Sequence, residues 1–523
     1  MRRFFILTLL SASVAFRPLA FAGVAGEALS KNRTTSASRA RTFTLDQAIQ
    51  SALRQNPSIL NAIQEIERTK GVIIQIRAEA LPHISPSGSF EWIDPNLRSS
   101  SSFVSSGTTP GTTGGASGGI SGAAPAAAPA ATPITGFGRG RASDLIYSIR
   151  VTGTQLIFNG TTWPAIRGSF FQRDSAYFAL RNTVDQVLAT VKTQFYQIVV
   201  NKALIGVQQE SVHLLESQLK DQQNRFEAGT VPRFNVLQAE VALYNQIPNL
   251  ITAQNNYRIS QLTLAKTLGL DFDPRRGNNP PLEVVGEMPY NPRNITLVDA
   301  IELGKQHRPF LKQARANVLN QIEQVHVALG GFLPTINTTG GGEWLSSNFN
   351  SSFGDISKGW IAQVTGSWAI WDSGDVYGRV KQQRALLQES KITYDDDVRQ
   401  VELEVQTAYS NLQFNRELIQ SQEKNVEQAN EALRLAKARL DAGAGTQLDV
   451  LNAQVQLLTA ESTRLQALFG YNSSLAEFDR VTGAQSVYTE SFNGIAPRAA
   501  KSRIYDTSSG RDAQGKPRRN ALE

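Results

Sequence analysis

The sequence has no cysteine, and only two methionines and four histidines occur among its 523 residues. Without cysteine, the chain can have neither a disulfide framework nor a thiol that accepts a lipid. The histidines, at positions 83, 213, 307 and 326, show no metal-ligand spacing. No phosphate-binding glycine loop or nucleophile motif is present either. We therefore expect no metal site, no cofactor and no enzymatic activity.

Long apolar runs are also scarce. Beyond the N-terminus, no window approaches the roughly 18 apolar residues of a membrane-spanning helix. Residues 1–22 combine Arg2 and Arg3, an apolar run, and the small residues Ala20 and Ala22, a pattern typical of a cleaved signal peptide. An uncleaved anchor is the alternative, but the run is too short to cross a bilayer. We therefore expect an exported chain.

Positive charge is concentrated at the two ends of the chain. The net charge is +7, but Arg2, Arg3 and Arg17 lie in the N-terminal segment and residues 485–523 are basic. A charge confined to the ends is poor support for binding DNA or RNA. We expect no nucleic-acid partner.

The first half of the chain recurs in the second half. Leu81-Pro82 recurs as Leu333-Pro334 (334 − 82 = 252), and Ala228-Gly229 recurs as Ala442-Gly443 (443 − 229 = 214). A tandem duplication of this length indicates two similar structural units in one architecture.

The duplication sets the expected domain boundaries. The first repeat spans 42–270 and the second spans 296–484, with a linker at 271–295 and a disordered tail at 485–523. Thr44 with Gln47 fits a capping box. From there we expect one helix that runs toward Pro82.

The period of the sequence then changes to two. Residues 84–92 and 145–158 alternate apolar with polar side chains, as do 336–344 and 360–370. This pattern predicts two strands of about ten residues in each repeat, a length that crosses a bilayer when tilted. A soluble hairpin would show the same alternation.

The strands of the first repeat are joined by a long loop, 93–143. Its residues 99–136 carry no charge and are nearly all Ser, Gly, Thr, Ala and Pro. Such a segment cannot build a core. We expect a mobile loop that faces the cell exterior.

Very long helical stretches follow the strands. Residues 163–229 contain no proline after Pro164. Five residues of the second repeat step by three and four, which predicts a coiled-coil seam: Val426, Ala429, Leu433, Ala436 and Leu440. Their counterparts are Val212, Leu215, Leu219, Gln222 and Phe226. Each long helix ends at a turn from which another helix returns.

Four strands cannot close a membrane barrel, and lipid does not tolerate open sheet edges. Two copies would give eight strands and a barrel filled by side chains. Three copies give twelve, the smallest multiple that leaves a lumen. The expected fold is therefore mainly α-helical with transmembrane β-strands, four from each chain, which several copies pool into one closed barrel.

These features resemble the TolC-like outer membrane efflux proteins. The resemblance covers the whole chain after residue 22 and depends on the duplicated order of elements, the paired Leu-Pro, the two Ala-Gly turns, and Gly443 followed by Asp449-Val450-Leu451. It implies a homotrimer whose β-barrel lies in the outer membrane and is continued by a long periplasmic α-helical barrel. It also implies that this trimer is an outer-membrane exit duct for small molecules. The implied partners are outer membrane lipid, a periplasmic adaptor and an inner-membrane transporter.

The resemblance also implies where the partners bind. The adaptor would dock at the two helical turns, at Phe226, Gly229, Thr230, Leu440, Gly443 and Thr446. The periplasmic entrance would be lined by Asp449, Asn452 and Asn235. In such proteins a second acid often stands at the position of Asn452, and an arginine at that of Gly445. This entrance is therefore expected to be locked more weakly or differently.

Charged residues on the predicted strands suggest a lumen. Glu91 and Glu343 occupy equivalent strand positions, and Arg150 lies on a third strand. A carboxylate pair could indicate acid–base chemistry, but the duplication explains the pair more simply. We assign all three residues to the wet inner face of the barrel.

Two other functions fit the same pattern. An exit duct of a type I protein secretion system would share the fold. A soluble periplasmic coiled-coil scaffold would share the helices but form no pore. The residues do not identify the cargo.

Overall fold

The computed structural model describes residues 41–92, 145–270, 282–346 and 357–484. In chain order the first repeat holds β1 (Arg41–Phe43), α1 (Leu45–Gln55), α2 (Pro57–Ala78), β2 (His83–Trp92), β3 (Leu145–Phe158), α4 (Thr162–Glu227) and α5 (Arg233–Thr267). After β4 (Leu282–Val284), the second holds α6 (Leu297–His307), α7 (Pro309–Gly330), β5 (Thr335–Ser346), β6 (Ser357–Ser367), α8 (Asp375–Asp441) and α9 (Gln447–Thr482).

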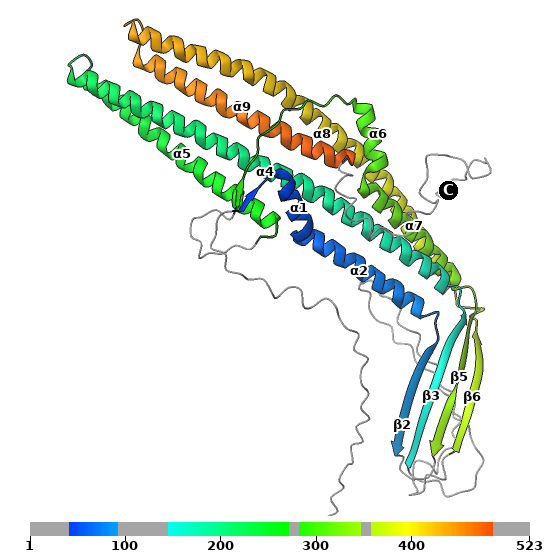
Figure 1. Cartoon of the computed structure of the whole chain (residues 1–523). Helices are drawn as coiled ribbons and strands as arrows, with labels where there is room; N and C mark the ends of the chain where they lie inside the picture. Colours follow the sequence, from blue (N-terminus) through cyan, green and yellow to red (C-terminus); the bar gives the residue numbers. More distant parts are fainter. Residues whose placement is uncertain (1–40, 93–144, 271–281, 347–356, 485–523) are drawn as a thin grey trace, which may run out of the picture.

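The molecule is elongated, with the sheet at one end and the helical turns at the other (Figure 1). Two antiparallel hairpins, α4 with α5 and α8 with α9, run side by side along its length. At 66 and 67 residues, α4 and α8 each extend about 100 Å at 1.5 Å per residue. Among the described helices, none is long and apolar enough to cross a membrane.

The predicted helix from Thr44 toward Pro82 is wrong, because two helices occupy this segment. The capping box at Thr44 is confirmed, since the Gln47 backbone N–H donates to the Thr44 hydroxyl. However, α1 ends at Gln55, and the side chain of the next residue, Asn56, accepts from the Ser58 N–H at 2.9 Å and so begins α2. Pro57 at the first helical position lacks the N–H that would continue α1. The second repeat breaks at the equivalent place, before Pro309, although Arg308 supplies no side-chain cap there.

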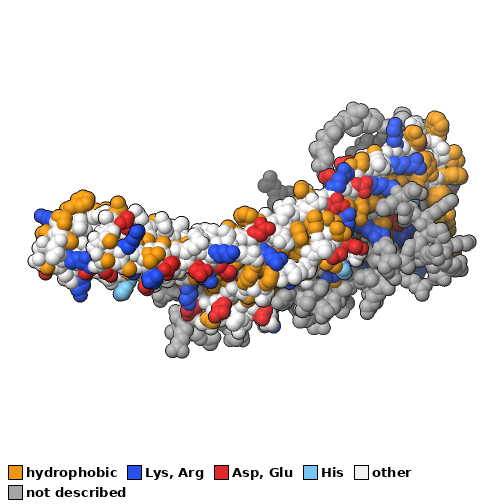
Figure 2. Space-filling view, turned by 90° about the horizontal axis from the view of Figure 1, so that it is seen from above, with side chains coloured by type: hydrophobic (Ala, Val, Ile, Leu, Met, Phe, Trp, Pro, Cys, Tyr) orange, Lys and Arg blue, Asp and Glu red, His pale blue; other side chains and the backbone are white. Residues whose placement is uncertain are grey.

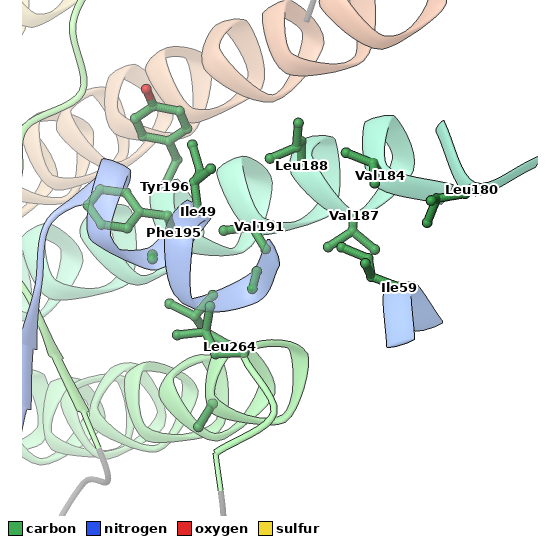
Figure 3. Packing of buried hydrophobic residues seen from close by; sticks show 14 of the residues in the cluster. Ile49, Ile59, Leu180, Val184, Val187, Leu188, Val191, Phe195, Tyr196 and Leu264 are labelled. Atoms are coloured by element: carbon green, nitrogen blue, oxygen red, sulfur yellow. The ribbon is translucent and has the colours of Figure 1, made fainter. Parts of the chain in front are cut away.

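The core lies where the short helices cover the long ones. Ile49 of α1, Ile59 of α2 and Leu264 of α5 converge on the buried face of α4 that carries Val187 and Val191 (Figure 3). A second cluster forms between α6, α8 and α9 around Tyr471. Both clusters lie midway between the sheet and the turns, and each packs the short helices of one repeat against its own long hairpin. Phe469 of α9 also packs against the first cluster.

A two-stranded parallel ribbon, β1 with β4, also lies at this level. No sequence pattern predicted it, since three-residue strands show no usable period. It places part of the segment described above as a linker against the start of the first repeat. The predicted signal peptide (1–22), exterior loop (93–143) and tail (485–523) lie outside the described residues.

Candidate functional site

The four long strands form one antiparallel sheet in the order β2-β3-β5-β6. The hairpins of the two repeats therefore meet at β3 and β5, which leaves β2 and β6 as edges. Alternation places side chains of opposite character on the two faces. Ile84, Ile149 and Trp360 lie on one face and are exposed. In Figure 2, apolar side chains gather at the end of the molecule that carries the sheet.

The opposite face of the sheet is polar. Ser89 and Ser148 pair across β2 and β3, with their hydroxyls 2.7 Å apart. Two residues further along β3, Arg150 lies opposite Glu343 of β5, and its guanidinium donates to the carboxylate at 2.7 Å. Both side chains are partly exposed. This ion pair joins the two repeats on the face that a lumen would need.

The structure thus brings two of the three predicted lumen residues together. Glu91 pairs with Ile146 in the register; its side chain is not among those described. Of the described residues, no three His, Cys, Asp or Glu gather in a manner that could hold a metal ion. The sheet therefore offers an amphipathic wall with one ion pair on its polar side.

At the far end, both long helices end in the same turn. Gly229 and Gly443 have φ of 73° and 71°, a left-handed conformation that glycine adopts without strain. At the first turn, Gly229 N–H donates to Phe226 C=O, and Thr230 N–H donates to Arg225 C=O. The second turn repeats both bonds, from Gly443 to Leu440 and from Ala444 to Arg439. These are Schellman motifs, which explain why the helices stop here.

Asp449, predicted to line the entrance, also caps its own helix. Its Oδ2 accepts from the Thr446 backbone N–H at 2.9 Å and from the Thr446 hydroxyl at 2.8 Å. These bonds, with the backbone donor foremost, hold the pKa of Asp449 below its ordinary value. The carboxylate is exposed and stays charged. Asn452, one turn further along α9, is exposed too, whereas Asn235 is half-buried on α5.

Buried amides join the two hairpins near their turns, a contact that was not predicted from the sequence. Gln222 Nε2 of α4 donates to Gln447 Oε1 of α9 at 3.3 Å. Gln222 had been placed on a coiled-coil seam, where its counterpart in the second repeat is Ala436. The contact could have been suspected from the sequence, because a polar glutamine stands at a seam position where the second repeat has the small apolar Ala436.

A polar cavity of about 300 Å³ lies between α4 and α5. Amides from Gln194, Gln197, Asn201 and Asn256 line it, together with the exposed Ile259. It holds no acid, base or nucleophile in catalytic array.

Comparison with known proteins identifies the family. The family model described as "Outer membrane efflux protein" matches residues 48–270 and 300–484. Solved structures agree in fold: the CmeC outer membrane channel of Campylobacter jejuni is 16% identical with a TM-score of 0.67, and covers 86% of this chain and 89% of its own. The MtrE channel of Neisseria gonorrhoeae, in its open state, is 16% identical with a TM-score of 0.61, and the match covers 84% of this chain and 88% of that one.

The curated relatives match a smaller share of this chain than the solved structures do. The toluene efflux pump outer membrane protein TtgC of Pseudomonas putida is 24% identical over 56% of this chain and 58% of its own length. Nodulation protein T of Rhizobium leguminosarum is 23% identical over 58% of this chain and 63% of its own. The chain thus matches about three fifths of the length of these relatives. Because the family model covers both repeats, the chain belongs to the outer membrane efflux protein family and is an outer-membrane protein that extends into the periplasm.

Proposed function

We propose that three copies of this chain form a passive exit duct, the outer-membrane part of a tripartite efflux system for small molecules. The observation that carries the proposal is the amphipathic sheet with two unpaired edges, β2 and β6. In lipid, unpaired edges must be closed. Twelve strands from three copies close them and leave a lumen lined by the face that carries Arg150 and Glu343.

The helices support the same closure. In its own chain α4 packs on α1, α2, α5, α7 and α9, whereas α8 packs on α6, α7 and α9. By the duplication, α2 and α5 are the counterparts of α7 and α9. Helices α7 and α9 of the second repeat pack on α4, but within the described part of the chain α2 and α5 do not pack on α8 in the equivalent way. We infer that α2 and α5 of the next copy occupy these positions on α8.

The exposed fractions of equivalent side chains on α4 and α8 agree with this missing contact. Val200 of α4 is 2% exposed, but Phe414, its counterpart 214 residues later on α8, is 62% exposed. Ala189 is buried, and its counterpart Leu403 is exposed. Such apolar residues need a partner, and the repeat indicates that the partner is a second copy of the chain.

The matching surface lies on α5. Its exposed apolar residues follow one another at spacings of three, four, seven or eight residues, which makes a coiled-coil stripe along the helix. They are Phe234, Leu237, Val241, Tyr244, Ile251, Ile259 and Leu262. The α5 stripe would pack on α8 of the neighbouring copy. The polar cavity beside Ile259 lies at this same junction.

The remaining partners follow from position. The exposed apolar face of the sheet suits outer membrane lipid. The turns around Gly229 and Gly443 lie farthest from the sheet (Figure 1), so they suit a periplasmic adaptor and, through it, an inner-membrane transporter. Relatives such as TtgC are named as outer membrane proteins of efflux pumps. Family membership counts against a soluble scaffold.

The function is tested by deleting the gene and measuring drug susceptibility and intracellular dye retention. We expect both to rise and to be restored by the wild-type gene. The deletion strain is also complemented with Phe414→Asp, which places a charge on the α8 interface and should fail to restore export. Unchanged susceptibility and dye retention after deletion would contradict the proposal.

A further inference from the structure

Arg308, the residue before α7, stands where the first repeat has an asparagine. Its counterpart at the offset of 252 is Asn56 (308 − 252 = 56). The Asn56 side chain accepts from two N–H groups at the start of α2 and donates to Thr267 C=O at 2.7 Å. The Arg308 side chain makes no such bond to the start of α7, and its Nη2 donates to Glu404 of α8 instead. A positive charge thus lies where the first repeat has a neutral amide.

The guanidinium of Arg308 is buried and only partly bonded. The residue is 4% exposed, and its Nε and Nη1 have no hydrogen-bond partner among the residues that the structure describes. The ring of Phe310, whose centroid lies 5.5 Å from Cζ, attracts the charge but does not replace an acceptor for both groups. Buried charged donors that lack an acceptor destabilise a fold. The two N–H groups therefore favour a bound ligand that accepts hydrogen bonds.

Positive charge outnumbers negative charge around this guanidinium. Charged side chains from four helices form one cluster with it. The positive ones are Arg181 of α4, Arg308 and Lys312 at the start of α7, and Arg480 of α9. The negative ones are Asp185 of α4, Glu404 of α8 and Glu477 of α9. The balance is 4 − 3 = +1, and the adjoining ion pair of Lys305 with Glu402 does not change it.

This surplus is felt inside the cluster. Burial, and then the positive charge of Arg181, lower the pKa of Lys312. A buried surplus charge is costly unless a counter-ion balances it. One monovalent anion would balance the cluster, whereas a divalent anion would leave it negative.

The cluster becomes more positive in mild acid. Burial raises the pKa of Asp185 to about 6, although Arg181, Arg480 and Arg308 attract its charge. Below that pH the carboxyl group is neutral, and the balance rises to 4 − 2 = +2. An anion next to Arg308 repels the ionised carboxylate, so anion binding and protonation of Asp185 should favour each other. His307, which precedes Arg308, is exposed, so water screens its charge.

The start of α7 also attracts negative charge. This helix has 22 residues, and the N–H groups of its first turn carry partial positive charge. In the first repeat, Asn56 Oδ1 accepts from the equivalent groups of α2, the Ser58 and Ile59 N–H. An arginine side chain has no acceptor to offer them.

We propose that each copy binds one small monovalent inorganic anion, a halide, beside Arg308 at the start of α7. The Arg308 guanidinium donates to the anion, and the anion balances the surplus charge of the cluster. It supplies an acceptor where the Asn56 oxygen supplies one in the first repeat. All of these residues belong to one copy, so the inference does not depend on the proposed duct.

The test is thermal unfolding of the purified full-length protein in detergent, at constant ionic strength, as chloride replaces gluconate. An anion that binds only the folded state stabilises it as the logarithm of its concentration. We expect the wild-type melting temperature to rise with chloride. Arg308→Asn restores the residue of the first repeat, and its melting temperature should not depend on chloride. The matched control is Arg293→Gln, which removes an exposed arginine that pairs with Asp479 and should keep the wild-type dependence.

Two further measurements locate the anion. Anomalous scattering from crystals of the wild type grown in bromide should place one ion per copy within hydrogen-bond distance of Arg308. Chloride should stabilise the wild type more in mild acid than in mild base, whereas Asp185→Asn should gain equally in both. A wild-type melting temperature that ignores chloride, or the same rise in Arg308→Asn, would overturn the site. So would a bromide map with no ion and a direct bond between Arg308 and Asp185.

Discussion

Replacing Asp449 separates two effects of one carboxylate, its charge at the entrance and its cap on α9. Threefold symmetry would place three Asp449 carboxylates around the periplasmic mouth. A ring of like charge attracts multivalent cations. We therefore expect a trivalent cation added on the periplasmic side of a planar bilayer to reduce the conductance of the trimer. Asn452 supplies no second charge, so the block should be modest and should weaken as salt rises.

The structure defines two variants that differ only in the cap. Asp449→Ala removes the acceptor of the Thr446 N–H and hydroxyl, while the Thr446 hydroxyl still accepts from the backbone N–H of residue 449. Losing this half of the capping box costs less than the about 1 kcal/mol per copy of a lost N-cap. Asp449→Asn removes the charge but keeps an oxygen that can accept from Thr446. Both variants should relieve the block. Only the alanine variant should unfold at a lower temperature.

The pH dependence follows from the same contacts. Because the Thr446 N–H lowers the pKa of Asp449 below the ordinary 3.8, the carboxylate stays ionised in mild acid. The block should therefore persist as pH falls and be lost only as pH passes below that range. Equal block in wild type and Asp449→Asn would refute the assignment of Asp449 to the entrance.

Three further predictions concern the turns, the core and the lumen. At Gly443 an added Cβ meets nothing within 4 Å, so Gly443→Val costs only about 1–2 kcal/mol of backbone strain. The Gly443→Val trimer should form on native gels but lose export, whereas Gly443→Asn should retain export. The same results are expected for these substitutions at Gly229. Asp185 is 5% exposed, and burial raises its pKa to about 6 against the attraction of nearby arginines. Because the folded state binds this proton more tightly than the unfolded state, the free energy of unfolding should fall by about 3 kcal/mol as pH rises from 3.8 to above 6. Melting curves of Asp185→Asn should lack this pH dependence. Glu343→Gln leaves Arg150 unpaired, so the reversal potential in a salt gradient should shift toward anion selectivity; no shift would place the pair outside the conducting path.

Long-period features of the fold could be predicted from the sequence. The strand at 145–158 has the predicted bounds, because alternation persists over fourteen residues. The turns at Gly229 and Gly443 were located by the duplication. The break at Asn56 was not predicted, although Pro57 marked it, because the apolar pattern continues across both helices. The β1–β4 ribbon joins segments of three residues, too short for any pattern.

The details of the candidate site were harder to predict. Arg150 and Glu343 are 193 residues apart, and only the choice of β5 as the partner of β3 brings them together. The contact between Gln222 and Gln447 depends on how two helices are rotated against each other, which one sequence does not reveal. The cap at Asp449 could have been found, since Thr446 precedes it by three residues, the spacing recognised at Thr44.

The central claim is that α5 of one copy packs on α8 of the next as α9 packs on α4. Thr193 and Ser473, 3.4 Å apart in one chain, have the counterparts Thr407 and Ile259 at the offset of 214, and both are exposed. Oxidising Thr407→Cys with Ile259→Cys in membranes should yield a covalent trimer on denaturing gels, because the chain has no native cysteine. Each single variant should remain monomeric. A double variant that also remains monomeric, while Thr193→Cys with Ser473→Cys bridges within the chain, would contradict the account.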